Sequence, residues 1–186
     1  MTSSLFKDPC FQGYYFCRPE MAERHEIPAY KMNYLRILQI ANQPELDGGK
    51  LAAAIRQEAS LVYRLLRYLN SPAFTLRTKV DSIPHALTLL GERDTRKWIS
   101  LVAVAEMGSD KPHELVLVPL PRARFCELLA EAGELRNRAN DLFLMGLLSA
   151  LDAIMDLPMS SVLADIPVQQ EIKEALFGQA GRFALF

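Results

Sequence analysis

Apolar residues recur at helical spacing through most of this chain. Between residues 30 and 41, Leu35 and Leu38 fall on one side of the predicted helix, whereas Lys31 and Arg36 fall on the other and are expected in solvent. The same spacing, interrupted by glycine and proline, predicts further helices at 51–57, 60–69, 82–91, 94–107, 121–132, 140–155, 158–164 and 167–176. No part of this region has the pattern of a core strand. The pattern therefore predicts an all-α fold, built as a multi-helix bundle.

Two helix boundaries carry specific expectations. Asp47 is expected to cap the helix at 51–57, because a carboxylate can accept a hydrogen bond from the free N–H groups of a first turn. Residues 112–132 are densely apolar but contain Pro119 and Pro121, and proline is strongly unfavourable inside a helix. We therefore expect a break there and a fresh helix from Pro121.

The two ends of the chain differ from the rest. Residues 11–16, FQGYYF, form an orphan β-like segment, and a lone strand is not stable without a sheet to pair with. It is either an arm that docks on the helices or the last piece of a neighbouring sheet domain, and we favour the second. The apolar ending at 182–186 either tucks into the core or precedes a further helix, and the sequence does not decide between these.

Composition excludes several classes of function. Half of the residues are apolar, which permits a sizeable core, and the 21 basic and 22 acidic residues are interspersed, so no basic stripe favours nucleic acid. No apolar run reaches the roughly 18 residues needed to cross a membrane. The three cysteines have no zinc-ligand spacing, and their odd number without a signal peptide favours the reducing cytoplasm. We expect a cytoplasmic protein that uses no cofactor.

Candidate chemistry centres on the predicted helix at 140–155. There Gly146-Leu147-Leu148 is followed by Ser149 and Ala150; a serine hydroxyl is a poor ligand for a transition metal, and alanine has no donor. Asp152 follows Ser149 by three residues and should share nearly the same helix face. The three histidines nowhere occur at i, i+4, so a histidine metal site is not expected. We predict neither a metal site nor a catalytic residue.

Three segments resemble a known family. Residues 65–74, LLRYLNSPAF, contain Asn70, Ser71 and Pro72 after a helix; residues 82–91, SIPHALTLLG, end in Leu90 and Gly91; the third is the helix that contains Gly146. In this order and spacing they resemble the HDOD domain, a helical signalling relative of the HD phosphohydrolases. The resemblance implies an HD-domain-like helical bundle.

The resemblance also explains the helix at 140–155. In HD phosphohydrolases a similar helix reads Gly-Leu-Leu-His-Asp, and the His and Asp hold the metal; this chain has Ser149 and Ala150 in their place. The turn at residues 70–72, after the predicted helix at 60–69, has a physical explanation of its own. The Asn70 side chain can bond main-chain groups where a helix ends, and Pro72 fixes the direction of exit. Gly91 is expected to cap its helix with a positive φ.

Further segments indicate a particular subtype of HDOD domain. Residues 92–101, 122–127 and 157–163 look like HDOD domains fused behind an EAL domain, a barrel that hydrolyses cyclic di-GMP, and residues 11–19 are similar to the closing strand of that barrel. The resemblance implies an EAL remnant at 1–20, a linker at 21–27 and an HDOD domain at 28–186, and it leaves open whether closing helices are missing at the C-terminus. The EAL motif and its metal-binding carboxylates are absent, so hydrolysis is not carried over.

These observations predict a regulatory or protein-interaction module of bacterial cyclic di-GMP signalling that is not an enzyme. Expected partners are the EAL domain of a full-length protein, another signalling protein or a second copy in a homo-oligomer, with no nucleic acid and no membrane. The expected interaction surface is the groove near Ser149 and Asp152, or the helix face of Lys97 and Trp98, although Trp98 is expected in the core more than in an interface. Alternatives are a weak metal-dependent phosphohydrolase using Asp152, and a small-molecule sensor with an apolar cavity above about 300 Å³.

Overall fold

The computed structural model describes residues 27–74, 79–164, 166–179 and 183. Every regular element in these ranges is helical, which confirms the all-α prediction: α1 Ala29–Ala41, α2 Gly48–Arg56, α3 Ala59–Leu69, α4 Ile83–Met107, α5 His113–Leu117, α6 Pro119–Ala132, η2 Arg136–Arg138, α7 Ala139–Leu148, α8 Leu151–Met155, α9 Met159–Val162 and α10 Gln170–Leu176. The β-like segment at 11–16, with its EAL-remnant and linker assignments, lies outside the described residues apart from Ile27.

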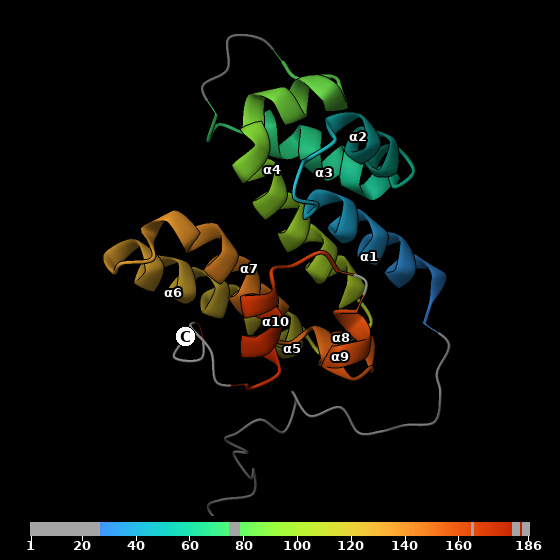
Figure 1. Ribbon diagram of the computed structural model, residues 1–186. Coiled ribbons are helices and arrows are strands. Elements are labelled where there is room, and N and C mark those ends of the chain that lie inside the picture. The colour runs from blue at the N-terminus through green and yellow to red at the C-terminus, as the bar shows by residue number, and fades with distance from the viewer. Residues whose placement is uncertain (1–26, 75–78, 165, 180–182, 184–186) are drawn as a thin grey trace, which may run out of the picture.

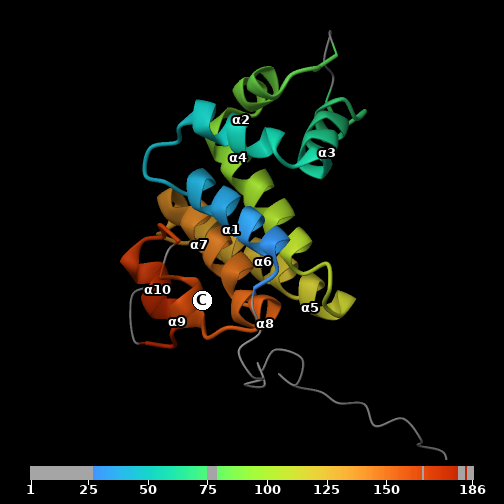
Figure 2. The ribbon, with the colours of Figure 1, turned by 90° about the vertical axis from the view of Figure 1, so that its right-hand side faces the viewer.

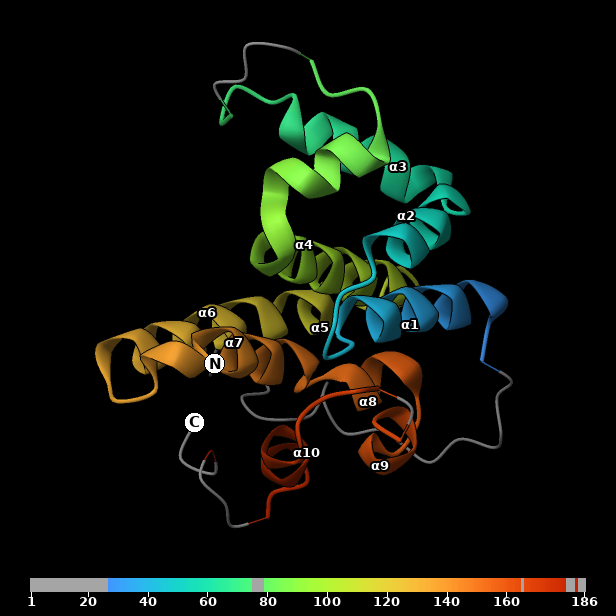
Figure 3. The ribbon, with the colours of Figure 1, turned by 45° about the horizontal axis from the view of Figure 1, so that its top comes forward.

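The long helix α4 runs through the centre of the molecule. It contacts α1, α2, α3, α7 and α8, so most of the helices pack on it directly. The helices α2 and α3 with the beginning of α4 form one end, and α8, α9 and α10 lie at the opposite end (Figures 1 and 2). The antiparallel pair α6 and α7 lies beside the second half of α4 (Figure 3). None of the described helices is long and apolar enough to cross a bilayer.

A glycine bends α4. Two helices were predicted at 82–91 and 94–107, and the structure joins them at Gly91, which has φ 71° and ψ 171° in the middle of the element. The prediction of a positive φ at Gly91 is confirmed, but the residue makes a kink instead of a helix end. The next helical turn begins directly after it, so the two halves of α4 point in different directions (Figure 3).

Local signals set several other boundaries. The carboxylate of Asp47 accepts a hydrogen bond from the Lys50 N–H at 3.0 Å, as predicted, and α2 begins at Gly48. The expected fresh helix from Pro121 begins two residues earlier, at Pro119. Both prolines fit because the first turn of a helix does not need their missing N–H groups.

The prediction that Lys31 lies in solvent is wrong. Only 1% of Lys31 is exposed, its Nζ donates to the main-chain oxygen of Ile154 at 2.8 Å, and it pairs with a carboxylate oxygen of Asp110 at 2.8 Å. Lys31 precedes Leu35 by four residues and Leu38 by seven, so it lies on the same buried face of α1 as these leucines, and α8 and the loop after α4 reach that face. An ammonium group can be buried there because both of these oxygen atoms compensate its lost hydration.

The C-terminal segment contributes one described residue to the interior. Phe183 is fully buried in a second, smaller cluster with residues of α6, α7 and α10, and the guanidinium of Arg138 lies 5.0 Å from the centre of its ring. This agrees with the first of the two alternatives for the apolar ending, in which it tucks into the core.

Candidate functional site

The element predicted as one helix at 140–155 is divided in the structure. α7 ends at Leu148 and α8 begins at Leu151, and between them Ala150 has φ −120° and ψ 15°. The Ser149 hydroxyl donates to the main-chain oxygen of Gly146 at 2.8 Å, a bond that a serine can offer in competition with the helical pattern. The prediction of a single helix over 140–155 is therefore wrong at Ser149 and Ala150.

Ser149 and Ala150, which follow the Gly146-Leu147-Leu148 run, differ in their surroundings. Arg122 of α6 donates to the Ser149 hydroxyl at 3.2 Å, while Ala150 is buried. Ser149 lines a cavity of about 240 Å³ with Arg122, Phe125, Cys126, Met145 and Leu176, among others. Apart from Arg122 and Ser149 the side chains of this cavity are mainly apolar.

Asp152 does not join Ser149 in that cavity. It lies in the first turn of α8, half-buried, and one of its carboxylate oxygens accepts the Ala153 N–H at 2.8 Å. Burial raises the pKa of this carboxyl above its ordinary value, and the main-chain hydrogen bond only partly offsets that effect. The expectation of a shared helix face is wrong, because the break at Ala150 changes the direction of the chain between the two residues.

Gly146 makes the close approach of α6 and α7 possible. A Cβ atom at this position would lie 2.7 Å from the main-chain nitrogen and Cα of Ala123, closer than real side chains come. The two helices therefore pack backbone to backbone, and this contact places Arg122 next to Ser149.

The side chain of Asn70 joins the end of α3 to the segment that leads into α4 by hydrogen bonds. The Asn70 amide donates to the main-chain oxygens of Leu66 at 2.8 Å and Val80 at 2.7 Å, and its oxygen accepts the Val80 N–H at 2.9 Å. The Ser71 carbonyl accepts the Phe74 N–H at 3.0 Å. These bonds agree with the expected role of Asn70 in ending a helix, and they tie the entry to α4 onto the end of α3.

The remaining family residues lie after the end of α3 and inside α4. Pro72 is exposed directly after α3, and Leu90 packs half-buried against the main core just before the Gly91 kink. His85 and His113 are both exposed, and His25 lies outside the described residues. Among the residues that the structure describes, no group of three or more His, Cys, Asp or Glu side chains could hold a metal ion.

Lys97 and Trp98, expected as one interaction surface, point to different parts of the molecule. Lys97 bonds to Glu127 of α6, and its Nζ lies 5.1 Å from the centre of the Phe143 ring of α7. Trp98 is half-buried and stacks on Tyr68 of α3, with ring centres 6.3 Å apart. Successive residues of a helix do not share a face, and here they connect α4 to opposite neighbours.

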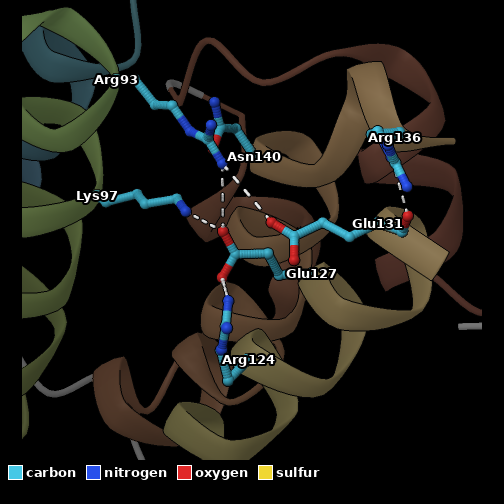
Figure 4. A network of polar contacts seen from close by, with 7 residues as sticks. All are labelled: Arg93, Lys97, Arg124, Glu127, Glu131, Arg136 and Asn140. Atoms are coloured by element: carbon cyan, nitrogen blue, oxygen red, sulfur yellow. Dashed lines mark hydrogen bonds and ion pairs between the residues drawn. The ribbon is translucent and has the colours of Figure 1, made fainter.

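Glu127 of α6 was not singled out from the sequence, yet it joins three basic side chains. Glu127 is almost fully buried; it bonds to Lys97 and, at 2.6 Å, to Arg124, and Arg93 lies 3.7 Å away (Figure 4). Burial opposes its ionisation, but the hydrogen bonds and charges of Lys97 and Arg124 outweigh burial and hold the pKa of Glu127 below its usual value. A signal existed: Glu127 falls at helical spacing among the small residues of the inner face of α6.

A second cavity opens beside this network. It has a volume of about 340 Å³ and lies between α4, α7 and the segment leading into α10. Polar side chains line it next to the aromatic ring of Phe143, namely Arg93, Lys97, Asn140 and Gln169. Arg93 also donates to the Asn140 side chain at 2.9 Å, so the wall of the cavity continues into the Glu127 network (Figure 4).

Comparisons with known proteins assign the family. The model of the HDOD domain matches residues 27–172. The chain is 30% identical over 171 residues to cyclic di-GMP phosphodiesterase CdgJ of Vibrio cholerae, an alignment that covers 92% of this chain and 40% of the relative. It is 28% identical over 171 residues to uncharacterized protein YuxH of Bacillus subtilis, covering 90% of this chain and 42% of the relative. The chain thus spans less than half the length of both curated relatives.

A solved structure supports the fold alone. The crystal structure of an HDOD domain protein with unknown function from Geobacter sulfurreducens matches with a TM-score of 0.52 at 22% sequence identity, covering 84% of this chain and 57% of that one. The predicted HD-like helical fold is confirmed by this match together with the helical content described above.

One prediction is overturned by these comparisons. The sequence predicts a protein that is not an enzyme, whereas a relative that aligns with nearly the whole chain is named a cyclic di-GMP phosphodiesterase. That name points to enzymatic activity and to cyclic di-GMP signalling. The HDOD family model matches residues 27–172, which is most of the chain. This chain therefore belongs to the HDOD domain family.

Proposed function

We propose that this chain is the regulatory, partner-binding portion of a cyclic di-GMP signalling protein of the phosphodiesterase type. In the arrangement we propose, residues 1–20 belong to the end of an EAL domain, 21–27 form a linker and 28–186 form the HDOD domain. The name of the Vibrio cholerae relative and the similarity of residues 11–19 to the closing strand of EAL domains support this proposal.

One observation carries the proposal: adjacent residues of α4 contact opposite parts of the domain. Trp98 stacks on Tyr68 of α3, and Lys97 bonds to the buried Glu127 of α6. A partner that contacts the aromatic side therefore acts on the same helical turn that holds the α6 network. Regulation requires that the partner bind one arrangement of these helices more tightly than another.

The aromatic side of α3 and α4 is the docking surface that we propose. Tyr68 is 43% exposed and lies edge-on to Phe74, with ring centres 4.9 Å apart, while its other contact is Trp98. Tyrosine and tryptophan are enriched at protein interfaces because each combines a large apolar surface with a polar group. The proposed occupant is the EAL domain of the same protein or another signalling protein.

The test compares two tyrosines on one helix. Tyr68→Ala removes the exposed part of the aromatic side, and Tyr63→Ala removes a more exposed ring (63%) that lies over Arg67 on the same helix. In the full-length protein we expect Tyr68→Ala to change the rate of cyclic di-GMP hydrolysis severalfold and Tyr63→Ala to leave it unchanged. Equal effects of the two variants would contradict the proposed docking surface.

The same assay, run on residues 1–186 alone with elemental analysis for bound metals, locates the activity. Hydrolysis that requires the longer protein agrees with the regulatory role. Turnover by residues 1–186 together with a bound metal would instead favour the metal-dependent phosphohydrolase alternative.

A second candidate function is a small-molecule sensor. The 340 Å³ cavity beside Lys97 falls within the size range of ligand pockets, and it combines an aromatic ring with several polar groups. This cavity is more polar than the apolar cavity expected from the sequence for such a sensor. A ligand there would stabilise the folded protein, so a screen of nucleotides and metabolites by thermal unfolding tests this function, with Asn140→Leu as the variant that should abolish any response.

A further inference from the structure

The outer face of α6 carries an apolar stripe that the proposed function does not use. Phe125 is 59% exposed, Leu128 45% and Leu129 38%, and Pro121 and Ala132 are exposed on the same side of the helix. We call these five residues the α6 stripe. The opposite face of α6 is already buried against α7, through Ala123, Cys126, Glu127 and Ala130.

The spacing of the α6 stripe is that of a helix-pairing seam. Pro121, Phe125, Leu128 and Ala132 alternate steps of four and three residues, the interval at which one helix presents a continuous edge to another. Large side chains at the two central positions, Phe125 and Leu128, would fill the middle of such a seam. A single exposed leucine needs no explanation, but three large apolar residues within little more than one turn do.

The charged residues beside the α6 stripe would complement those of a second copy of the same helix. Arg124 and Glu131 are seven residues apart, so they lie two turns from each other on the same flank of the stripe. When two identical helices pair antiparallel about a two-fold axis, residues on the same flank face each other. Arg124 of one copy then lies near Glu131 of the other, and the symmetry makes this contact twice.

Both charged groups can turn toward such a partner. Arg124 bonds to the buried Glu127 through one N–H group, and a guanidinium has five. The Glu131 carboxylate makes a loose contact with Arg93 at 3.9 Å, while the main-chain oxygen of Glu131 accepts from Arg136 (Figure 4). A partner of uniform charge would leave either Arg124 or Glu131 opposite a like charge, whereas a second copy of the chain matches both.

We propose that the α6 stripe is a homodimer interface in which two copies of this domain pair antiparallel through α6. The contact is a single helix wide, and interfaces of this size belong to the weaker, reversible class. We therefore expect a dimer that forms at micromolar concentrations and dissociates on dilution. The interface lies on α6, whereas the docking surface proposed above lies on α3 and α4.

Sedimentation velocity over a dilution series tests the interface with a matched pair of variants. Leu128→Lys places a charge in the seam, and Leu89→Lys places one at an equally exposed leucine (44%) on the first half of α4. We expect Leu128→Lys to weaken dimerisation at least tenfold and Leu89→Lys to have no effect. Circular dichroism of both variants verifies that the helical content is unchanged.

A second pair of variants tests the charges and does not alter the apolar residues. Glu131→Lys turns both cross-contacts into repulsions with Arg124, whereas Glu134→Lys changes an exposed acid beyond the end of α6. We expect only Glu131→Lys to weaken the dimer. A chain that stays monomeric at hundreds of micromolar, or equal effects within either pair, would overturn the proposal. So would a monomeric chain whose α6 stripe instead binds another domain in a manner sensitive to Leu128→Lys.

Discussion

Asn70 and Val80 are joined by two hydrogen bonds that run in opposite directions. The Asn70 amide donates to the Val80 main-chain oxygen at 2.7 Å, and its oxygen accepts the Val80 N–H at 2.9 Å. Val80 is almost completely buried, and Asn70 supplies a partner to both of its main-chain groups. The asparagine at the end of α3 thereby holds the start of the segment that leads into α4.

Replacement of Asn70 by alanine should destabilise the protein by about 2–4 kcal/mol, because two buried main-chain groups of Val80 lose their partner. Asn70→Asp retains an acceptor for the Val80 N–H but has no amide donor, so we expect an intermediate loss. Urea unfolding at constant m-value measures both changes. A loss below about 0.5 kcal/mol in Asn70→Ala would show that other groups can replace these hydrogen bonds.

The kink in α4 should depend on glycine at position 91. The pair φ 71° and ψ 171° is populated almost only by glycine, so Gly91→Ala should destabilise the fold by about 1–3 kcal/mol. Gly48→Ala is the control, since neither site has a heavy atom within 4 Å of an added Cβ and only Gly91 has a positive φ. Thermal unfolding should show a lower Tm for Gly91→Ala alone. Equal Tm shifts in Gly91→Ala and Gly48→Ala would contradict the explanation that the loss comes from the backbone conformation at Gly91.

The contact between α6 and α7 should tolerate no side chain at position 146. An added Cβ would meet the Ala123 backbone at 2.7 Å, and the backbone cannot move aside without displacing the whole helix. We expect Gly146→Ala to cost about 1–3 kcal/mol and to disturb the hydrogen bond from Arg122 to Ser149. Denaturant unfolding gives the first effect, and NMR shifts of residues around Ser149 give the second. Unchanged stability would mean that the helices can separate freely.

Lys31 and Lys50 both form ion pairs but should differ in importance. Removal of the buried Lys31 leaves the Ile154 carbonyl without its donor and creates a cavity, so Lys31→Ala should cost about 2–3 kcal/mol; the partial exposure of Asp110 keeps the figure below that of a fully buried pair. Lys50 pairs with Asp47 at the surface, 3.5 Å apart, and Lys50→Ala should cost less than about 0.5 kcal/mol. Chemical denaturation ranks the two; similar losses would refute the burial argument.

Glu127 should make part of the stability dependent on pH. Its pKa is lowered in the folded protein, so its ionised form stabilises the fold above the ordinary glutamate pKa of about 4.3, and this contribution disappears as the pH falls through its folded pKa. The stability difference between wild type and Glu127→Gln should therefore be largest near neutral pH and shrink on acidification. Glu134→Gln, at an exposed site beyond the end of α6, is the control variant. A stability difference between wild type and Glu127→Gln that persists at acid pH would contradict an ionised Glu127 in the folded protein.

Most of the helical framework follows from local patterns in the order of residues. Apolar spacing located α1, α3 and both halves of α4, and local chemistry marked the cap at Asp47, the stop at Asn70 and the positive φ at Gly91. These features depend on backbone geometry and on groups a few residues apart. Short-range signals of this kind can be read from the order of residues alone.

The burial of charged groups and the pairing of helix faces depend on residues that are distant in the sequence. Lys31 is buried because Asp110 and Ile154, distant in sequence, reach it, and Glu127 is buried because α4 brings Lys97 opposite it. The break between α7 and α8 was hidden by an uninterrupted apolar run, and it emerged where Arg122 meets Ser149 across the α6 contact. Spacing reports which side of a helix is apolar, but partners on other helices decide whether a polar residue stays in water.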